Sequence, residues 1–181
     1  MGRSEQSSDA TGPWGRFFKL RTQHLEAPAY RESRGTYTRT VYDLITSYDK
    51  PGTDLTPEAK VRRLAVAKQA GADLFKLVEK SRNQALSGDG LTAPTEWKLP
   101  VRGQESLGEL RYPDKGSDVS RLHHRVYFGV PRNWPTVILW LHAAPKPDAS
   151  LDADWAKIQD AAIDDAITIR TEYYLDHPGC G

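Results

Sequence analysis

Residues 121–146, with the sequence RLHHRVYFGVPRNWPTVILWLHAAPK, predict two neighbouring strands joined by a tight connection. Over residues 121–130 apolar side chains alternate with polar ones, which indicates one packed face and one wet or functional face. The second face is basic and carries Arg121, His123, Arg125 and Tyr127. Residues 137–144 are apolar at nearly every position, as expected of a strand buried on both faces in the middle of a sheet. Because Pro131 and Pro135 cannot donate to a ladder, the two strands are expected to form a hairpin.

Two helices are predicted before this hairpin. Thr56, Pro57 and Glu58 form a helix start, with a hydroxyl cap, a proline in the first position and an acid in the first turn. A long helix over residues 57–86 follows this start. A short helix near residues 41–48 precedes it, so the two are expected to form an antiparallel helical hairpin.

Two more strands and a final helix complete the expected fold. Residues 97–101 and 107–112 are expected to extend the strand pair into an antiparallel meander. Asp152 is the expected cap of a helix whose apolar residues recur every three or four positions. These apolar residues are Trp155, Ile158, Ala162, Ala166, Ile169 and Tyr173. We therefore expect an α+β protein with an N-terminal helical hairpin, an antiparallel sheet of three to four strands and a C-terminal helix.

The pattern divides the 181 residues into three parts. Residues 1–56 are expected to be an N-terminal extension, partly flexible, with the short helix near its end. Residues 57–176 are expected to form the folded domain, which is long enough for a substantial core. Residues 177–181 are expected to be a disordered tail.

Composition narrows the possible chemistry. The longest apolar run is far short of the roughly 20 residues that cross a bilayer, and the N-terminus has no apolar signal core, so a cytoplasmic location without a membrane partner is expected. The single Cys180 can form neither an internal disulfide nor a cysteine metal cluster. Five scattered histidines and the lack of a glycine-rich phosphate loop disfavour metal hydrolases and nucleotide-binding proteins. No metal and no cofactor is expected.

Charge is distributed unevenly along the chain. Residues 57–147 carry 15 basic and 9 acidic side chains, a balance of +6, whereas residues 148–181 carry 2 and 8, a balance of −6. A basic centre beside an acidic end is expected if the centre binds a polyanion. The alternative is that the two regions neutralise each other across their packing surface.

Four short motifs in this order resemble the RelE/HigB superfamily of bacterial toxins. They are LGELRY at 107–112, HRVYF at 124–128, VILWLHAAPK at 137–146 and TEYY at 171–174. The order and spacing are similar to the branch common in phage-derived genes, whose members read "ELR", "yRvxY/F", "ivLLhgfxKK" and "A..R..eY". The resemblance covers about residues 57–175.

This resemblance implies a metal-independent endoribonuclease that cuts messenger RNA, often at the ribosome, and is neutralised by an antitoxin protein. Such enzymes promote attack of a ribose 2′-hydroxyl on the adjacent phosphate, which requires fixed cations and groups that move protons. Arg111 matches the arginine of "ELR", Arg125 that of "yRv", and Lys146 the first lysine after the central strand. His123 is the best general acid or base, because an unperturbed histidine titrates near pH 6.5. The expected catalytic residues are therefore Arg111, His123, Arg125 and Lys146.

Strand alternation predicts a basic surface around these residues. Glu109 shares a face with the arginine of its strand, and Tyr127 shares a face with His123 and is placed to stack on a base. Arg121 and Arg132 are expected to add contacts to RNA. The expected RNA-binding residues are thus Glu109, Arg121, Tyr127 and Arg132.

Other polar residues favour structural roles. His124 lies on the apolar side of its strand, and His142 lies in the central strand, so both are interpreted as core histidines. Tyr173 and Tyr174 stand where the family often carries a functional aromatic residue, although Tyr173 continues the buried stripe. Where the family often has paired lysines, this chain has Lys146 between two prolines.

Three hypotheses follow for the function. The first is a toxin-type endoribonuclease that acts on messenger RNA, with or without the ribosome. The second is a non-catalytic module of the same fold that binds nucleic acid or protein through its basic face. The third is a structural protein of a phage or mobile element that uses the scaffold for assembly.

Overall fold

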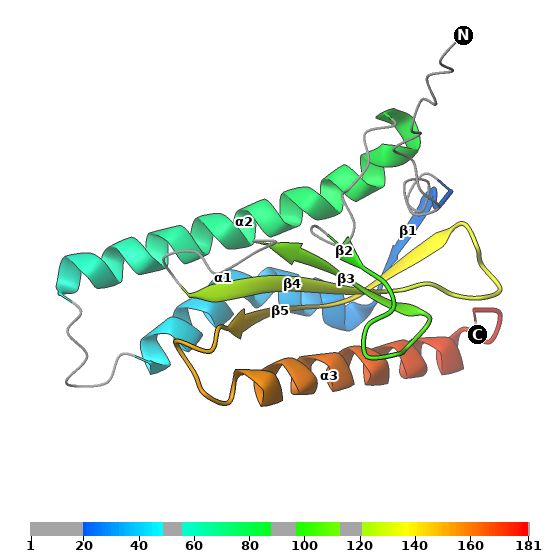
Figure 1. Ribbon diagram of the computed structural model, residues 1–181. Helices are drawn as coiled ribbons and strands as arrows, with labels where there is room; N and C mark the ends of the chain where they lie inside the picture. Colours follow the sequence, from blue (N-terminus) through cyan, green and yellow to red (C-terminus); the bar gives the residue numbers. More distant parts are fainter. Residues whose placement is uncertain (1–19, 49–55, 88–96, 113–120, 181) are drawn as a thin grey trace, which may run out of the picture.

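The computed structural model describes residues 20–48, 56–87, 97–112 and 121–180 (Figure 1). Within these ranges the chain forms three helices and five strands. In chain order they are β1 (Gln23–Glu26), α1 (Pro28–Ser47), α2 (Pro57–Ser87), β2 (Trp97–Lys98), β3 (Leu107–Tyr112), β4 (Leu122–Gly129), β5 (Val137–Pro147) and α3 (Trp155–Asp176). The predicted α+β class is confirmed.

The five strands form one sheet in the order β1, β5, β4, β3, β2. β3, β4 and β5 make the predicted antiparallel meander, and β2 adds a short antiparallel edge. β1 lies at the other edge and runs parallel to β5, with Gln23 beside Val137, 114 positions later. The prediction of an antiparallel sheet of three to four strands is therefore wrong in strand number and in this one pairing. β1 escaped prediction because its sequence, QHLE, is too short and too polar to show a strand period.

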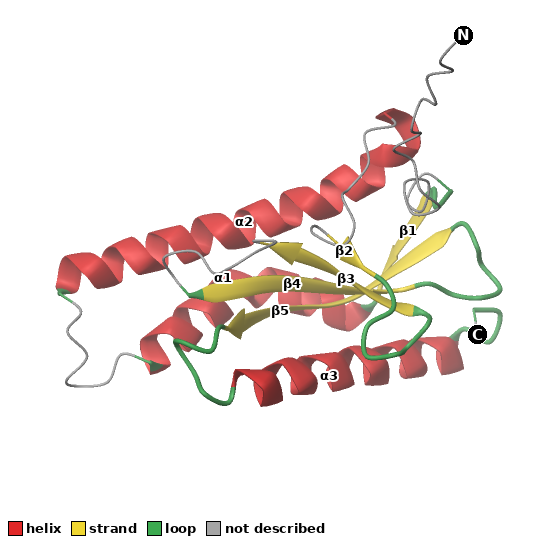
Figure 2. Cartoon of the chain, in the orientation of Figure 1, coloured by secondary structure: helices red, strands yellow, loops and turns green. Residues whose placement is uncertain are grey.

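Helices cover both faces of the sheet (Figure 2). α1 and α2 pack on one face, where the core includes Ile138 and Trp140 of β5, and α3 packs on the other, where it includes Leu139 and Leu141. β5 is thus buried on both faces and has β1 and β4 as neighbours, as the apolar run over residues 137–144 predicts.

A buried hydrogen bond joins α1 to β4. The hydroxyl of Tyr37 and Nδ1 of His124 lie 2.9 Å apart, and both side chains are buried. A Cβ atom at Gly71 of α2 would lie only 3.0 Å from Cε1 of Tyr37, so the glycine lets α2 approach this pair closely. The structural role favoured for His124 is confirmed.

The first helix is longer than predicted. α1 begins at Pro28, which occupies the first turn, and not near residue 41. Its buried residues are Tyr30, Tyr37, Val41 and Ile45. The polar residues between Tyr30 and Val41 conceal this stripe from a pattern based on consecutive apolar turns.

Two other predicted boundaries differ from the structure. Asp152 does not cap α3, which begins at Trp155; its Oδ1 accepts a hydrogen bond from the amide of Asp154 at 2.7 Å, and its Oδ2 accepts one from the Tyr48 hydroxyl at 2.6 Å. The strand predicted over residues 97–101 is limited to β2. Asp152 therefore links the turn before α3 to the end of α1.

Beyond β1, no strand of the described residues lies beside the outer edge of β5. The amide of Ala143 points to this edge and donates to Oγ of Ser33 in α1 at 3.1 Å. Amides alternate in direction along a strand, so the next outward positions are Pro145 and Pro147, which have no amide hydrogen. From Ala143 to Pro147 the edge therefore offers no free donor to a further strand.

The N-terminal extension, the folded domain and the C-terminal tail expected from the sequence are not separate in the structure. Residues 23–47, assigned to the N-terminal extension, supply an edge strand and a helix to the same sheet and core as residues 57–176. Residues 177–180, expected to be disordered, follow α3 as a turn in which the amide of Cys180 donates to the carbonyl of His177 at 2.8 Å.

Some predicted segments cannot be compared with the structure. The flexible start over residues 1–13 and the connections at 49–55 and 113–120 lie outside the described residues. Among the helices that are described, none is long and apolar enough to cross a membrane.

Replacement of Gly108 by alanine is expected to lower the free energy of unfolding by about 1–3 kcal/mol. The added Cβ would overlap the ring of Phe128, which lies directly across the ladder and is packed in the core against Trp140. Gly35→Ala is the matched control: nothing lies within 4 Å of its Cβ position in α1, so alanine should raise the free energy by up to about 1 kcal/mol. Urea unfolding measures both variants. Equal stabilities would contradict the placement of Phe128 over Gly108.

Candidate functional site

The register of the sheet gathers predicted site residues on the face that α3 covers. Arg111 of β3 lies opposite Arg125 of β4, and His123 of β4 lies opposite Lys146 of β5. Opposite residues in a ladder share a face, as do residues two apart in a strand, so Glu109 joins them. We call Glu109, Arg111, Arg125 and Lys146 the cationic cluster.

The carboxylate of Glu109 holds both arginines. Its Oε1 lies 2.7 Å from Nε and 2.6 Å from Nη2 of Arg111, and its Oε2 lies 3.7 Å from Nε of Arg125. Nη1 of Arg125 donates to the carbonyl of His124 at 3.0 Å. The side chains of Glu109 and Arg125 are only 3% and 8% exposed, whereas that of Arg111 is 22% exposed. Arg111 is therefore the arginine that a ligand reaches first.

Lys146 places a third cation in the cluster. Its Nζ lies 4.1 Å from the centre of the Trp155 ring, at the first residue of α3. Burial, followed by repulsion from Arg125, lowers the pKa of Lys146, although Glu109 opposes the change. Burial also lowers the pKa of Arg125. Two arginines share one buried carboxylate and Lys146 lies on the same face, so the cluster has more cations than anions, and perturbed pKa values of this kind concentrate at functional sites.

The structure does not bring every predicted residue to the cluster. Tyr127 shares its face but is buried in the core under α3, so its ring has no free surface for a base. Arg121 is exposed just before β4. Arg132, in the connection after β4, pairs with Glu105 at 3.2 Å at the opposite end of the sheet. His142 is half-buried, and burial lowers its pKa.

Two residues near the cluster were not predicted as site residues. Lys98 lies opposite Glu109 in β2 and is exposed, so it adds a cation beside the cluster. A strand was predicted here, but its register against β3, which sets Lys98 opposite Glu109, has no signal in the sequence. Trp155 was predicted only as a helix residue, and its contact with Lys146 follows from how α3 packs on the sheet.

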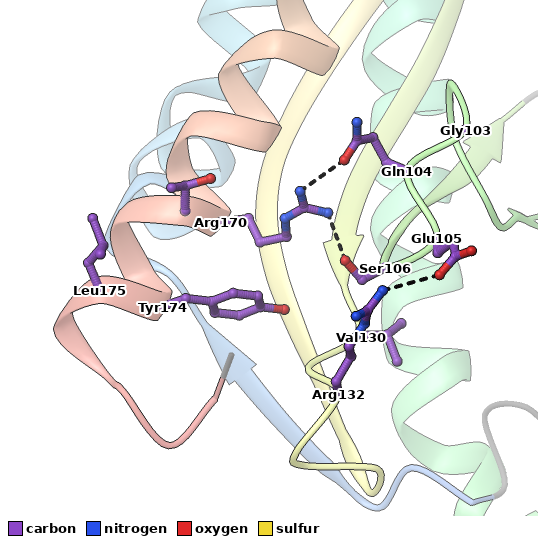
Figure 3. A pocket seen from close by; sticks show the side chains of 10 residues that line it. Gly103, Gln104, Glu105, Ser106, Val130, Arg132, Arg170, Tyr174 and Leu175 are labelled. Carbon is purple, nitrogen blue, oxygen red and sulfur yellow. Dashed lines mark hydrogen bonds and ion pairs between the residues drawn. The ribbon is translucent and has the colours of Figure 1, made fainter.

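A separate pocket of about 770 Å³ lies beside the C-terminal half of α3 (Figure 3). It is lined by Gly103, Gln104, Glu105, Ser106, Val130, Arg132, Arg170, Thr171, Tyr174 and Leu175. Arg132 is the one residue here that was expected to bind RNA. Apart from Val130, which follows β4, the others come from a turn and a helix end whose proximity has no signal in the sequence.

Comparisons give no family assignment. No protein-family model matches the chain, and neither a curated protein nor a solved structure matches it. Within the described ranges, no three histidine, cysteine or acidic side chains are grouped so that they would hold a metal ion. The site is therefore defined by the geometry of the cationic cluster.

Replacement of Glu109 by glutamine is expected to lower the free energy of unfolding by about 3 kcal/mol or more, because Arg111 and the buried Arg125 lose their shared counter-charge. Glu105→Gln is the matched control, since its pair with Arg132 is exposed and contributes about 0–1 kcal/mol. Thermal and urea unfolding compare the two. If both variants are equally stable, Glu109 does not compensate the buried charge.

Proposed function

We propose that the protein is a toxin-type, metal-independent endoribonuclease that binds a phosphodiester of messenger RNA at the cationic cluster. The RelE/HigB-like arrangement of the fold is part of this proposal. The observation that carries it is that Arg111, Arg125 and Lys146 lie on one face of three adjacent strands, with both arginines paired to the single carboxylate of Glu109.

The excess positive charge of the cluster can stabilise the negative charge that develops on the phosphate. A phosphodiester gains negative charge as the 2′-hydroxyl attacks, and fixed cations in a partly desolvated site stabilise that charge most strongly. Arg111 and Lys146 are the partly exposed members and contact the phosphate oxygens in this proposal. Arg125 is buried and does not contact the phosphate in this proposal. Its positive charge still stabilises the phosphate from a distance, and its ion pair with Glu109 holds the cluster together.

His123 supplies the proton transfer in this mechanism. It lies opposite Lys146 on the same face and is partly exposed. The 2′-oxygen bonds to phosphorus as its proton passes to His123, and the bond from phosphorus to the 5′-oxygen breaks as that oxygen takes a proton from water. The products are a 2′,3′-cyclic phosphate and a 5′-hydroxyl end. An antitoxin that covers the basic face would stop the reaction by excluding RNA.

The alternative is a binding module without catalysis. It is favoured by the burial of Arg125 and Tyr127, which leaves fewer groups in reach of RNA than the sequence predicts. Such a module would bind RNA with steep salt dependence and release no product.

Cleavage should be measured on a synthetic oligonucleotide with one ribonucleotide among deoxynucleotides, with EDTA present. Lys146→Met is expected to slow cleavage roughly 100-fold, because it removes a cation from the phosphate site. Lys157→Met is the matched control, since Lys157 is exposed on α3 and pairs with Asp154. A 2′-deoxy substrate should remain intact. RNA binding by the wild type without any product would favour the binding module instead.

The pH dependence of cleavage tests the charge of Lys146. A lysine is charged below its pKa, and burial with repulsion from Arg125 moves the pKa of Lys146 below the usual 10.5. Cleavage is therefore expected to decline on the alkaline side at a pH below 10.5. Lys146→Arg keeps its charge in this range and should move the decline to higher pH. Identical alkaline limbs for both proteins would exclude Lys146 as the titrating cation.

A further inference from the structure

The pocket beside the end of α3 is distinct from the cationic cluster. Arg170 lies 15 residues after Trp155 in the same helix, which corresponds to roughly 22 Å along the axis. The other walls of the pocket are the turn before β3 and the connection between β4 and β5. None of the four cluster residues lines it.

Arg170 is held in a fixed position by neutral groups. Its Nη1 donates to Oγ of Ser106 at 2.9 Å, and its Nη2 donates to Oε1 of Gln104 at 3.2 Å. No acidic side chain among the described residues forms an ion pair with it. A guanidinium has five donor hydrogens, so three remain after these two bonds. Arg170 thus presents an oriented charge that no described carboxylate neutralises, and this pre-organisation favours an anionic ligand.

Arg132 provides a second cation at the pocket. Its side chain is 77% exposed and pairs with Glu105, which is 81% exposed. An exposed pair of this kind contributes little, so a ligand anion can replace the carboxylate. In Figure 3 the ring of Tyr174 points from α3 toward the space between Arg170 and Arg132. Val130 adds a further apolar wall.

We propose that this pocket binds a nucleotide, with the phosphate between Arg170 and Arg132 and the base against the ring of Tyr174. The volume of about 770 Å³ is within the usual range of small-ligand pockets, roughly 300–1,000 Å³. Arginine forks match phosphate oxygens, and an aromatic wall accepts any base by stacking. The nucleotide is either a free nucleoside monophosphate or one unit of a single-stranded RNA. This binding does not depend on RNA cleavage at the cationic cluster.

Isothermal titration of the full chain with adenosine 5′-monophosphate, and separately with a short single-stranded oligoribonucleotide, tests the proposal. Arg132→Gln and Arg170→Met are each expected to weaken binding about tenfold or more. Glu105→Gln should leave affinity equal or increase it, because it removes the anion that competes for Arg132. Arg39→Gln, an exposed arginine of α1, controls for loss of one surface charge.

The pattern across these variants decides the source of the phosphate. Binding of the monophosphate that depends on Arg170 and Arg132 identifies a free-nucleotide site, and binding of the oligonucleotide alone with the same dependence identifies an RNA subsite. If Arg170→Met does not fold, the exposed Arg132→Gln and Glu105→Gln variants decide, since the first is expected to weaken binding and the second is not. The proposal is overturned if neither ligand binds at millimolar concentration, or if Arg132→Gln binds as tightly as the wild type.

Discussion

The buried carboxylate of Glu109 allows two arginines to lie together on the face of the sheet that α3 covers. Two arginines in adjacent strands lie directly opposite each other, an arrangement that would be repulsive and costly to bury without a shared anion. Glu109 contacts both arginines, and its own burial is tolerable only because they surround it. The same contact holds Arg111, the more exposed of the two arginines, on the face that also carries Lys146. Stability and any affinity for a polyanion therefore depend on one ion-pair network.

Much of the fold was predictable because the burial of one face of a helix or strand leaves a regular spacing of apolar residues in the sequence. β3 has the predicted bounds, and β5 is buried on both faces, as its apolar run indicates. Prediction failed where a partner distant in the chain decides the structure. β1 becomes a strand because β5 offers it an edge, and Asp152 contacts Tyr48 instead of capping α3.

The candidate site was predictable to a similar degree. Alternation places Glu109 and Arg111 on one face of their strand, because this follows from strand geometry alone, and the register of β3 and β4 then puts Arg125 on the same face. How deeply each side chain is buried depends on the packing of the whole face, so the sequence cannot distinguish the buried Tyr127 from the partly exposed Arg111. Arg170 was not predicted as a site residue, because its partners Ser106 and Gln104 belong to a turn that is remote in the sequence.

The parallel pairing of β1 with β5 also determines the order in which contacts of the sheet can form while the chain is being translated. A nascent chain emerges from its N-terminus, so β1 is complete long before the strand that it pairs with has been translated. Contacts between segments so far apart in the chain form late and slowly. Lys146 and Trp155 emerge later still than the arginines of β3 and β4, so the cationic cluster assembles only when translation of the domain is nearly finished. The RNA cleavage proposed for this cluster would thus begin only after most of the chain has been synthesised.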